Sequence, residues 1–459
     1  MLIRFSVENF LSFKERVEFS MLPGKGSSLR HHVRRGERRS DLAYLKSAII
    51  YGANASGKSN LVKAMHVAQS MVRQGSQKGK PLPAKPFRLD SETLHAPSRF
   101  EFEFKWQDTY YAYGFLVDAQ KVWEEWLAEI SKTKETPLFE RRTQENGAID
   151  VVMPGLRFPN PDARRRVGFM AEDTLPNELF LSSVNRRNLS ELKGIKPLQQ
   201  AYSWLTDRLK IIFPDSRMSG LEVELESDQA FSQIYNRLLD YFNTGIAGIE
   251  TQKVDFDSPS VKLPDEVKSA IKGNLSSGER VIFSALDGVR YTLRRDEGGE
   301  LFAVKMLTRH KVTGREEEEL FEVHEESDGT QRIMDLIPML ADLQKEPSVY
   351  VIDEIDRSLH PSLTYRLLEL FHSENSPTQG QLIVTTHESG LLDLDLLRKD
   401  EIWFVEKNAA GASSVYSLEE FKPRKDKEIR RGYLQGRYGA VPVFRPKQSL
   451  RAVLETEGA

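Results

Sequence analysis

A short segment bounded by glycines has the residue types needed to hold a phosphate group. Gly52, Gly57, Lys58 and Ser59 fit the pattern G-x-x-x-x-G-K-[ST]. In such a loop the glycines let backbone N–H groups converge on phosphate oxygens, the lysine reaches the β- and γ-phosphates, and the serine hydroxyl can bind Mg²⁺. The sequence therefore predicts a P-loop. The residues that we expect to line the phosphates are Gly52, Ala53, Asn54, Ala55, Ser56, Gly57, Lys58, Ser59 and Asn60.

Two carboxylates, Asp353 and Glu354, follow a second apolar stretch at residues 349–352. A strand that ends in a carboxylate can hold Asp353 beside Mg²⁺, so we assign the metal to Ser59 and Asp353. Because side chains alternate along a strand, Glu354 points elsewhere and is the candidate for polarising the attacking water. The pair is a weak motif alone, but it is a strong one beside a P-loop.

A third apolar stretch, residues 381–386, ends at His387, one predicted helix after the carboxylates. That position allows the imidazole to contact a γ-phosphate. We therefore expect Lys58, Glu354 and His387 to be the catalytic residues.

A second predicted helix start also has the features of an anion site. Ser327 is typical of an N-cap, and the exposed N–H groups of the turn that begins with Asp328 and Gly329 attract negative charge. This turn lies one helix upstream of the carboxylates, and Asp356 follows them. The chain thus has one P-loop and two helix starts suited to phosphate.

These residues need strands and helices to position them. Residues 46–51 are β-rich, and apolar residues behind the P-loop recur at i, i+3, i+4 and i+7, which predicts a strand followed by a helix. Alternating apolar residues predict an antiparallel layer at 3–7, 17–19, 99–105, 110–117 and 121–127.

The middle of the chain has a different pattern. Between about 195 and 290 the apolar spacing approaches 3.6 residues, including residues 198–213, so we predict a helical insert. A hairpin is expected behind it, with strands at 302–307 and 319–323. No long heptad array is evident, which argues against a coiled-coil arm.

The composition narrows the class of protein. The chain has 459 residues, 65 basic and 68 acidic, so it is not a polycation, and nucleic-acid binding would need local patches. It has no cysteine, which excludes disulfides and thiolate chemistry. The charged N-terminal segment is unlike a signal peptide, and no run of about 18 apolar residues predicts a membrane span. We expect a cytoplasmic protein without membrane contact.

Five elements, taken in chain order, resemble those of ABC-type ATPases. They are the P-loop (Walker A), the Ser327 turn (signature), Asp353-Glu354 (Walker B), Asp356 (D-loop) and His387 (switch histidine). Residues 9–13 resemble the N-terminal strand motif of the RecF/SMC/OLD branch. Segments 401–406 and 432–439 are similar to a compact bacterial family labelled AAA-family or RecF-like ATPases, whose members occur in phage-defence and abortive-infection systems.

The resemblance covers nearly the whole chain and implies an α/β fold. It implies an ABC-type (RecF/SMC-like) P-loop NTPase head with an N-terminal antiparallel β-layer and an inserted helical subdomain. The predicted boundaries are 1–190 for the first lobe, 191–300 for the insert and 301–459 for the second lobe.

The resemblance also implies ATP and Mg²⁺ as ligands and a site shared by two copies. ATP would be sandwiched between them, with Ser327, Asp328, Gly329 and Asp356 completing the site in trans, so homo-oligomers would be built from such dimers. This signature reads S-D-G-T where transporters have S-G-G-Q, and no Q-loop glutamine stands out, so we expect an ATPase whose hydrolysis is slow or depends on assembly.

Several functions are compatible with an ABC-type ATPase of this kind. Our first interpretation is a nucleotide-gated scaffold that controls a separate effector, a nuclease or toxin, because no effector domain is evident in the chain. The alternative is a RecF-like DNA-binding ATPase in repair or recombination. Its basic candidates, each also explained as solvated surface, are Arg30–Arg39, Arg164–Arg166, Lys422–Lys425, Arg430 and Arg431.

Two weaker motifs would instead give the chain a nuclease of its own. Asp393 and Asp395 form the D-x-D of Toprim nucleases, although only 64 residues follow Asp395. Arg366 and His372 form an R-x5-H, a loose match to toxin RNases, for which a charged outer helix face is the simpler explanation.

Overall fold

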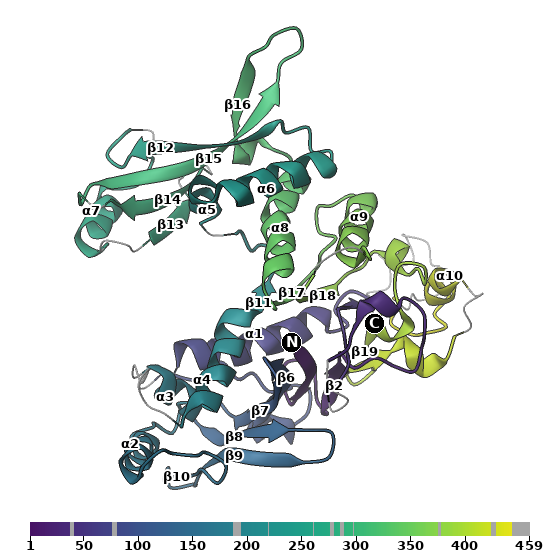
Figure 1. Ribbon diagram of the computed structural model, residues 1–459. Helices are drawn as coiled ribbons and strands as arrows, with labels where there is room; N and C mark the ends of the chain where they lie inside the picture. Colours follow the sequence, from purple (N-terminus) through teal and green to yellow (C-terminus); the bar gives the residue numbers. More distant parts are fainter. Residues whose placement is uncertain are drawn as a thin grey trace, which may run out of the picture.

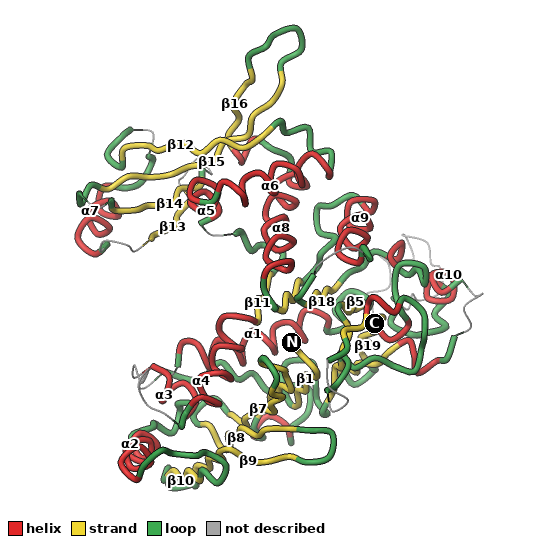
Figure 2. Tube along the Cα trace, viewed as in Figure 1, coloured by secondary structure: helices red, strands yellow, loops and turns green. Residues whose placement is uncertain are grey.

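The computed structural model describes residues 1–36, 41–75, 80–186, 194–218, 220–259, 261–275, 280–284, 289–296, 298–374, 378–423 and 428–442. These residues form two large sheets with helices between and around them, and an insert with a sheet of its own (Figure 1). Figure 2 shows the same arrangement by type of element. None of the helices in these ranges combines the length and the apolar character that crossing a bilayer requires.

A six-stranded core sheet positions the P-loop. Its order is β11-β17-β18-β5-β19-β20, with the first five strands parallel and β20 antiparallel. β5, β17 and β18 are buried along their whole length, as expected for a parallel sheet covered on both faces. The carboxyl ends of parallel strands meet at one edge, so the segments after these strands lie together. The strands are β5 (Ser47–Tyr51), β11 (Leu209–Ile212), β17 (Val349–Ile352), β18 (Gln381–Thr385), β19 (Ile402–Lys407) and β20 (Ser413–Ser417).

A seven-stranded antiparallel sheet, ordered β10-β9-β8-β7-β6-β1-β2, forms the second layer. Phe100, Phe102 and Phe104 alternate with less buried residues along β6 and enter the core. This confirms the predicted antiparallel layer. The strands are β1 (Leu2–Glu8), β2 (Val17–Ser20), β6 (Ser98–Trp106), β7 (Thr109–Val117), β8 (Val122–Ile130), β9 (Glu135–Thr143) and β10 (Ile149–Val152), beside a ribbon of β3 (Val33–Arg34) and β4 (Tyr44–Leu45).

Helix α1 packs between these two sheets. Its apolar stripe, which includes Leu61, Ala64, Met65 and Ala68, joins the cluster formed by both layers. Helices α8 and α9 contribute to a second cluster on the opposite face of the core sheet. The helices outside the insert are α1 (Lys58–Gln74), α2 (Pro161–Glu172), α3 (Phe180–Arg186), α4 (Lys196–Ser203), α8 (Asp328–Lys345), α9 (Pro361–His372) and α10 (Ile429–Leu434).

The insert is not the helical subdomain that the sequence predicts. It holds a sheet of order β12-β15-β14-β13, with β16 paired to β15, and helices pack beside it (Figure 1). Strand β12 is mostly exposed, so it lacks the apolar alternation that would have indicated a strand. The elements are α5 (Leu221–Ser227), α6 (Gln229–Tyr241), β12 (Gly248–Asp255), α7 (Asp265–Asn274), β13 (Arg280–Ser284), β14 (Arg290–Arg295), β15 (Leu301–Lys311) and β16 (Glu318–Glu322).

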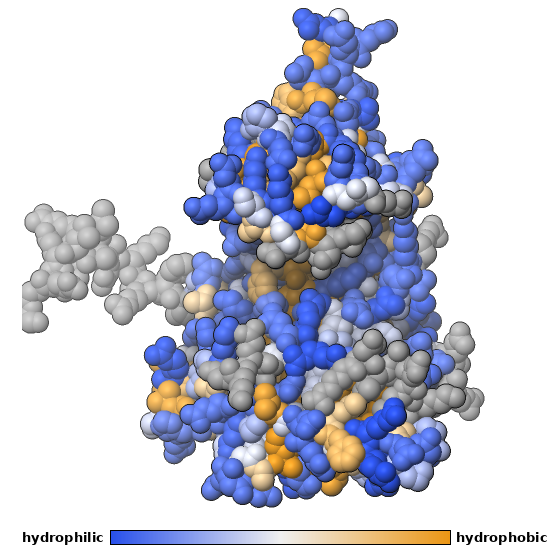
Figure 3. Space-filling model, turned by 90° about the vertical axis from the view of Figure 1, so that its left-hand side faces the viewer, coloured by the Kyte–Doolittle hydropathy of each residue, from blue (hydrophilic) through white to orange (hydrophobic). Residues whose placement is uncertain are grey.

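One boundary in the middle region also differs from the prediction, whereas the hairpin behind it does not. The helix predicted over 198–213 ends in a π-helical turn, Trp204–Arg208, and the chain continues as β11 at the edge of the core sheet. The β-branched Ile211 and Ile212 favour a strand at that point. The predicted hairpin is confirmed as β15 and β16, which project from the insert. Figure 3 shows a mostly hydrophilic surface with separate apolar patches, one of them on this projection.

Candidate nucleotide-binding site

The P-loop connects β5 to α1 at the carboxyl edge of the core sheet. The Nζ atom of the buried Lys58 donates to the carbonyl oxygens of Gly52 at 2.8 Å and Ala53 at 3.2 Å, so the lysine folds over its own loop. Glycine is needed at both ends of the loop. A Cβ at Gly52 would lie 2.5 Å from the Val405 carbonyl oxygen, and Gly57 has a φ of +117°.

Burial lowers the pKa of Lys58 to about 8, although the nearby carboxylates of Asp353, Glu354 and Asp356 favour the charged form. The ammonium group is therefore incompletely compensated. An anion placed in the P-loop would restore its charge, so the loop is prepared for phosphate.

The first turn of α1 and the ends of β17 and β18 meet at the Asp353 carboxylate. Asp353 Oδ1 accepts a hydrogen bond from Ser59 Oγ at 3.1 Å and one from Thr385 Oγ1 at 2.6 Å. Thr385 Oγ1 in turn accepts from the backbone N–H of Glu354 at 2.8 Å. The threonine at the end of β18 thus fixes both carboxylate-bearing residues after β17.

The Ser59 and Asp353 oxygens fit a magnesium ion. Mg²⁺ binds oxygen ligands at about 2.0–2.1 Å in an octahedron, whose neighbouring ligands are about 3 Å apart. The observed separation of 3.1 Å between Ser59 Oγ and Asp353 Oδ1 matches that spacing. A hydroxyl and one carboxylate leave the remaining positions for phosphate oxygens and water.

Glu354, Asp356 and His387 surround the same edge. Glu354 is partly exposed and has a φ of +51°, an uncommon conformation for a residue with a side chain. The backbone N–H of His387 donates to Asp356 Oδ2 at 3.3 Å. Partial burial and the positive charge of Lys58 lower the pKa of the His387 imidazole, so its neutral form predominates at pH 7.

The signature turn lies at the exposed start of α8. Ser327 caps the helix, because its Oγ accepts from the backbone N–H of Thr330 at 3.1 Å, while Ser327 and Asp328 face solvent. A Cβ at Gly329 would lie 2.7 Å from the Ser358 carbonyl oxygen, so the turn packs directly on the loop after Asp356. The helix start is therefore open to a second molecule and connected to the carboxylate loop of its own chain.

An open pocket of about 640 Å³ adjoins the first turn of α1. The side-chain amide of Asn60 donates to Ser12 Oγ at 2.8 Å on its wall, and Phe87, Leu89 and Leu94 add apolar surface. Leu89 is 71% exposed and Leu94 is 42% exposed. The sequence motif at residues 9–13 marks one wall, but the wall formed by residues 84–94 carries no pattern that predicts it.

Thr385 was also missed from the sequence. It belongs to a predicted strand, but a hydroxyl within an apolar run has no motif of its own. Its role follows from the register, in which Ile352 of β17 lies beside Val384 of β18, so that the following residues are neighbours.

The residues of the two possible nuclease motifs lie outside the nucleotide-binding site. The backbone N–H of Asp395 donates to Asp393 Oδ1 at 2.9 Å, and both line an open pocket with Arg430 and Arg431. Arg366 is exposed on α9, whereas His372 is buried, lies 3.0 Å from Ser47 Oγ and stacks on His32. Arg366 and His372 therefore do not face a common site.

The basic candidates lie on the surface where they are described. Arg164–Arg166 are exposed on α2, and Arg430 and Arg431 are exposed on α10. Four members of the basic stretches lie outside the described residues: Arg38, Arg39, Arg424 and Lys425.

Comparison with known proteins places these features in context. No curated protein matches the chain. Among solved structures, an Smc head bound to the C-winged helix domain of ScpA is 14% identical, with a TM-score of 0.42, covering 92% of this chain and 99% of that one. The SMC head domain from Thermotoga maritima is 16% identical, with a TM-score of 0.36 and coverage of 91% and 98%.

A third structure, an Smc head with an extended coiled coil bound to the C-terminal domain of ScpA derived from Pyrococcus furiosus, is 15% identical, with a TM-score of 0.36 and coverage of 92% and 99%. The parallel core sheet, the P-loop and the antiparallel layer themselves define an α/β, ABC-type P-loop NTPase head. The family model described as "AAA domain, putative AbiEii toxin, Type IV TA system" matches residues 47–393, and the chain belongs to that family of AAA ATPases.

Proposed function

We propose that the chain binds ATP with Mg²⁺, hydrolyses it in a site completed by a second copy, and uses this cycle to control a separate effector in phage defence. The observation that carries the proposal is the meeting of Ser59, Asp353 and Thr385 beside the P-loop. It supports a magnesium–triphosphate site because segments far apart in the sequence, the start of α1 and the ends of β17 and β18, bring these oxygens to one edge of the sheet.

The chain's own residues have distinct tasks in this reaction. Lys58 and the N–H groups of the P-loop would bind the phosphates, and Ser59 and Asp353 would hold Mg²⁺, which would supply positive charge to the triphosphate. Glu354 accepts a proton from water as the water oxygen attacks the γ-phosphorus. The bond from that phosphorus to the bridging oxygen breaks, which yields ADP and phosphate. The neutral imidazole of His387 contacts the γ-phosphate.

The second copy supplies the signature turn. Ser327, Asp328 and Gly329 lie on an exposed helix start whose N–H groups suit an anion. A γ-phosphate on the P-loop of one copy would satisfy this turn on the other, with Asp356 beside the contact. ATP then holds the two chains together, and hydrolysis releases them.

The family description supports the biological setting. It refers to an AbiEii-type toxin and a type IV toxin–antitoxin system, which suggests an abortive-infection context and a partner protein. We place the toxic or nucleolytic step in that partner. Co-purification with the products of neighbouring genes, with and without ATP, tests this assignment: a second protein that binds in only one nucleotide state supports it.

A RecF-like DNA-binding role is the second candidate. The exposed Arg164–Arg166 run on α2 favours it as a local basic patch. Phosphate contacts would make DNA affinity fall steeply with salt concentration, whereas a flat response removes this candidate.

Removal of the P-loop lysine tests the ATP-binding step directly. Lys58→Ala is expected to lower ATP affinity by at least about a hundredfold, since a charge-assisted contact to phosphate is lost in a buried site. Equilibrium dialysis with labelled ATP measures the change. Lys63→Ala, at an exposed position on the same helix, is the matched control and should bind normally. Retained affinity in Lys58→Ala would contradict the assignment.

A further inference from the structure

Arg332 is a buried cation on α8, five residues after Ser327. Its side chain belongs to a residue that is only 3% exposed, and no hydrogen-bond partner is found for Nε, Nη1 or Nη2 within the described part of the chain. Burying a guanidinium without a partner is costly, and such groups are normally paired. Among the described residues, the buried Arg332 guanidinium therefore has no hydrogen-bond partner, although the charges of Asp335 and Asp215 act on it.

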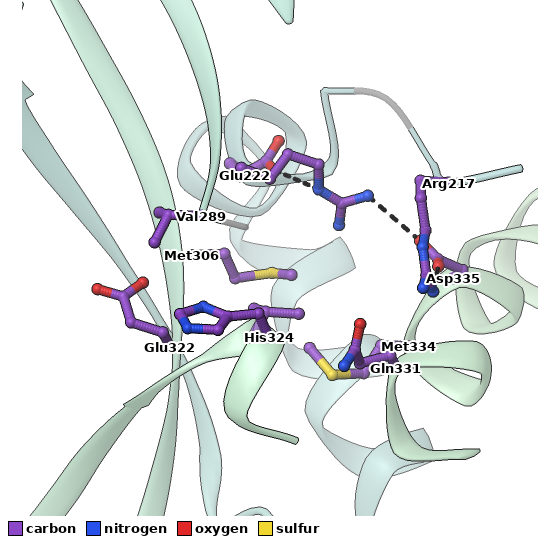
Figure 4. A pocket seen from close by; sticks show the side chains of 11 residues that line it. Arg217, Glu222, Val289, Met306, Glu322, His324, Gln331, Met334 and Asp335 are labelled. Atoms are coloured by element: carbon purple, nitrogen blue, oxygen red, sulfur yellow. Dashed lines mark hydrogen bonds and ion pairs between the residues drawn. The ribbon is translucent and has the colours of Figure 1, made fainter. Parts of the chain in front are cut away.

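Asp335, a carboxylate whose negative charge acts on Arg332, is already engaged. Asp335, one turn further along α8, accepts from Arg217 at 3.0 Å and lies 3.5 Å from Arg290, which also pairs with Glu222 at 3.4 Å. Figure 4 shows Arg217 on Asp335 and Glu222 on the other side of the small pocket that these residues line. Asp335 thus has little capacity left for Arg332.

The other carboxylate near Arg332 is held more weakly. Asp215, in the loop after β11, accepts from Arg357 at 2.8 Å, but its side chain is 86% exposed and that of Arg357 is 47% exposed. Exposed ion pairs contribute little to stability because water screens them. Four arginines, at 217, 290, 332 and 357, therefore share the carboxylates at 215 and 335.

Arg332 also lies on the side of α8 that contacts the carboxylate loop. It follows Gly329 by three residues, so both share one helix face. Gly329 packs on the Ser358 carbonyl oxygen, next to Arg357. A displacement of the signature turn would therefore move Arg332 relative to Arg357 and Asp215 at the same time.

We infer that Arg332 is a positioning residue that takes the Asp215 carboxylate from Arg357 when a second copy closes on the signature turn. The exchange gives the buried Arg332 guanidinium a carboxylate partner and leaves Arg357, whose side chain is 47% exposed, to be solvated by water, so it favours the closed position of α8. The exchange thereby transmits the approach of the second copy from α8 to the loop that follows Asp353 and Glu354. This inference rests on the proposed ATPase function.

Substitution by methionine separates this role from a structural one. Arg332→Met removes an uncompensated charge at similar volume, so the melting temperature should stay the same or rise. ATP affinity should match that of the wild type, while kcat falls about tenfold and KM changes little, the size expected for loss of one coupled pair. Arg332→Lys should restore part of kcat. Arg142→Met, at a side chain that is 70% exposed on β9, is the control and should match the wild type throughout.

A substitution at Asp215 provides a second test of the exchange. Asp215→Asn is at an exposed site and should fold normally, with the same loss of kcat as Arg332→Met. The double variant should lose no more than either single variant, and Arg357→Met should turn over ATP at least as fast as the wild type.

The outcomes distinguish the inference from the proposed function. Normal kcat in Arg332→Met, or additive losses in the double variant, would overturn the exchange and leave the ATPase intact. A lower melting temperature in Arg332→Met with unchanged kcat would also overturn it, since the guanidinium would then support the fold alone. Absence of ATP binding by the wild-type chain would instead overturn the proposed function.

Discussion

At the residue scale, the site is organised around one buried lysine and one buried carboxylate. Lys58 is held by carbonyl oxygens of its own loop, and Asp353 is held by the hydroxyls of Ser59 and Thr385. Both charged groups are thus already in position before a ligand binds, and phosphate and Mg²⁺ would replace these internal hydrogen bonds. Such preorganisation reduces the cost of ordering the site on binding.

The lowered pKa of Lys58 makes ATP affinity depend on pH. The folded pKa of about 8 lies below the ordinary value of 10.5, so the chain without nucleotide loses this proton above pH 8. Phosphate favours the charged lysine, and affinity should therefore fall roughly twentyfold between pH 7.5 and 9.5. Equilibrium dialysis of ATP without magnesium measures this. The same shift adds stability to the free chain as pH rises from 8 to 10.5, because the unfolded lysine keeps its proton longer. A flat affinity curve would contradict the pKa.

Thr385 should be needed for both stability and metal affinity. Thr385→Val keeps the shape but removes the hydroxyl that joins Asp353 to the backbone of Glu354, which should lower the free energy of unfolding by about 1–3 kcal/mol. Chemical denaturation measures that loss, and magnesium titration of ATP binding measures the weakened metal site. Thr385→Ser keeps the hydroxyl and is the control. Equal behaviour of the two variants would count against this role.

At the scale of elements, the strands that carry the site were predictable and the insert was not. β5, β17 and β18 are continuous apolar runs that end in residues able to do chemistry, so pattern and motif agree. β12 is largely exposed and β11 is a four-residue edge strand, and in both the deciding contact is a partner strand distant in sequence. Pairing of this kind has no local signal.

Helix α8 should matter for assembly and not for nucleotide binding by one chain. Ser327→Arg places a bulky cation on an exposed helix start, where it would obstruct an approaching phosphate without disturbing the P-loop. ATP affinity should be unchanged, while hydrolysis falls at least about tenfold and no longer rises with protein concentration. Ser327→Thr, which retains the capping hydroxyl, should stay active. Full activity of Ser327→Arg would refute a signature that works in trans.

At the scale of the whole molecule, the P-loop and the Ser327 turn are two separate helix starts of one chain, at the beginning of α1 and of α8. We propose that the P-loop edge binds a triphosphate and that the exposed Ser327 turn, which Ser327 caps, binds an anion. A second copy would complete both at once. The projecting hairpin β15–β16 leads through residues 323–325 to this turn, so a partner bound there would be connected to the closing contact.

The most direct test of the shared site is the mass of Glu354→Gln with and without ATP. This substitution keeps the binding residues but removes the group that accepts the proton, so ATP should persist and hold two copies together. Mass photometry should detect single chains without ATP and assemblies of two chains, or multiples of two, with ATP. Adding Ser327→Arg should return the protein to single chains. A mass that does not change with ATP, in protein that binds ATP, would contradict the account.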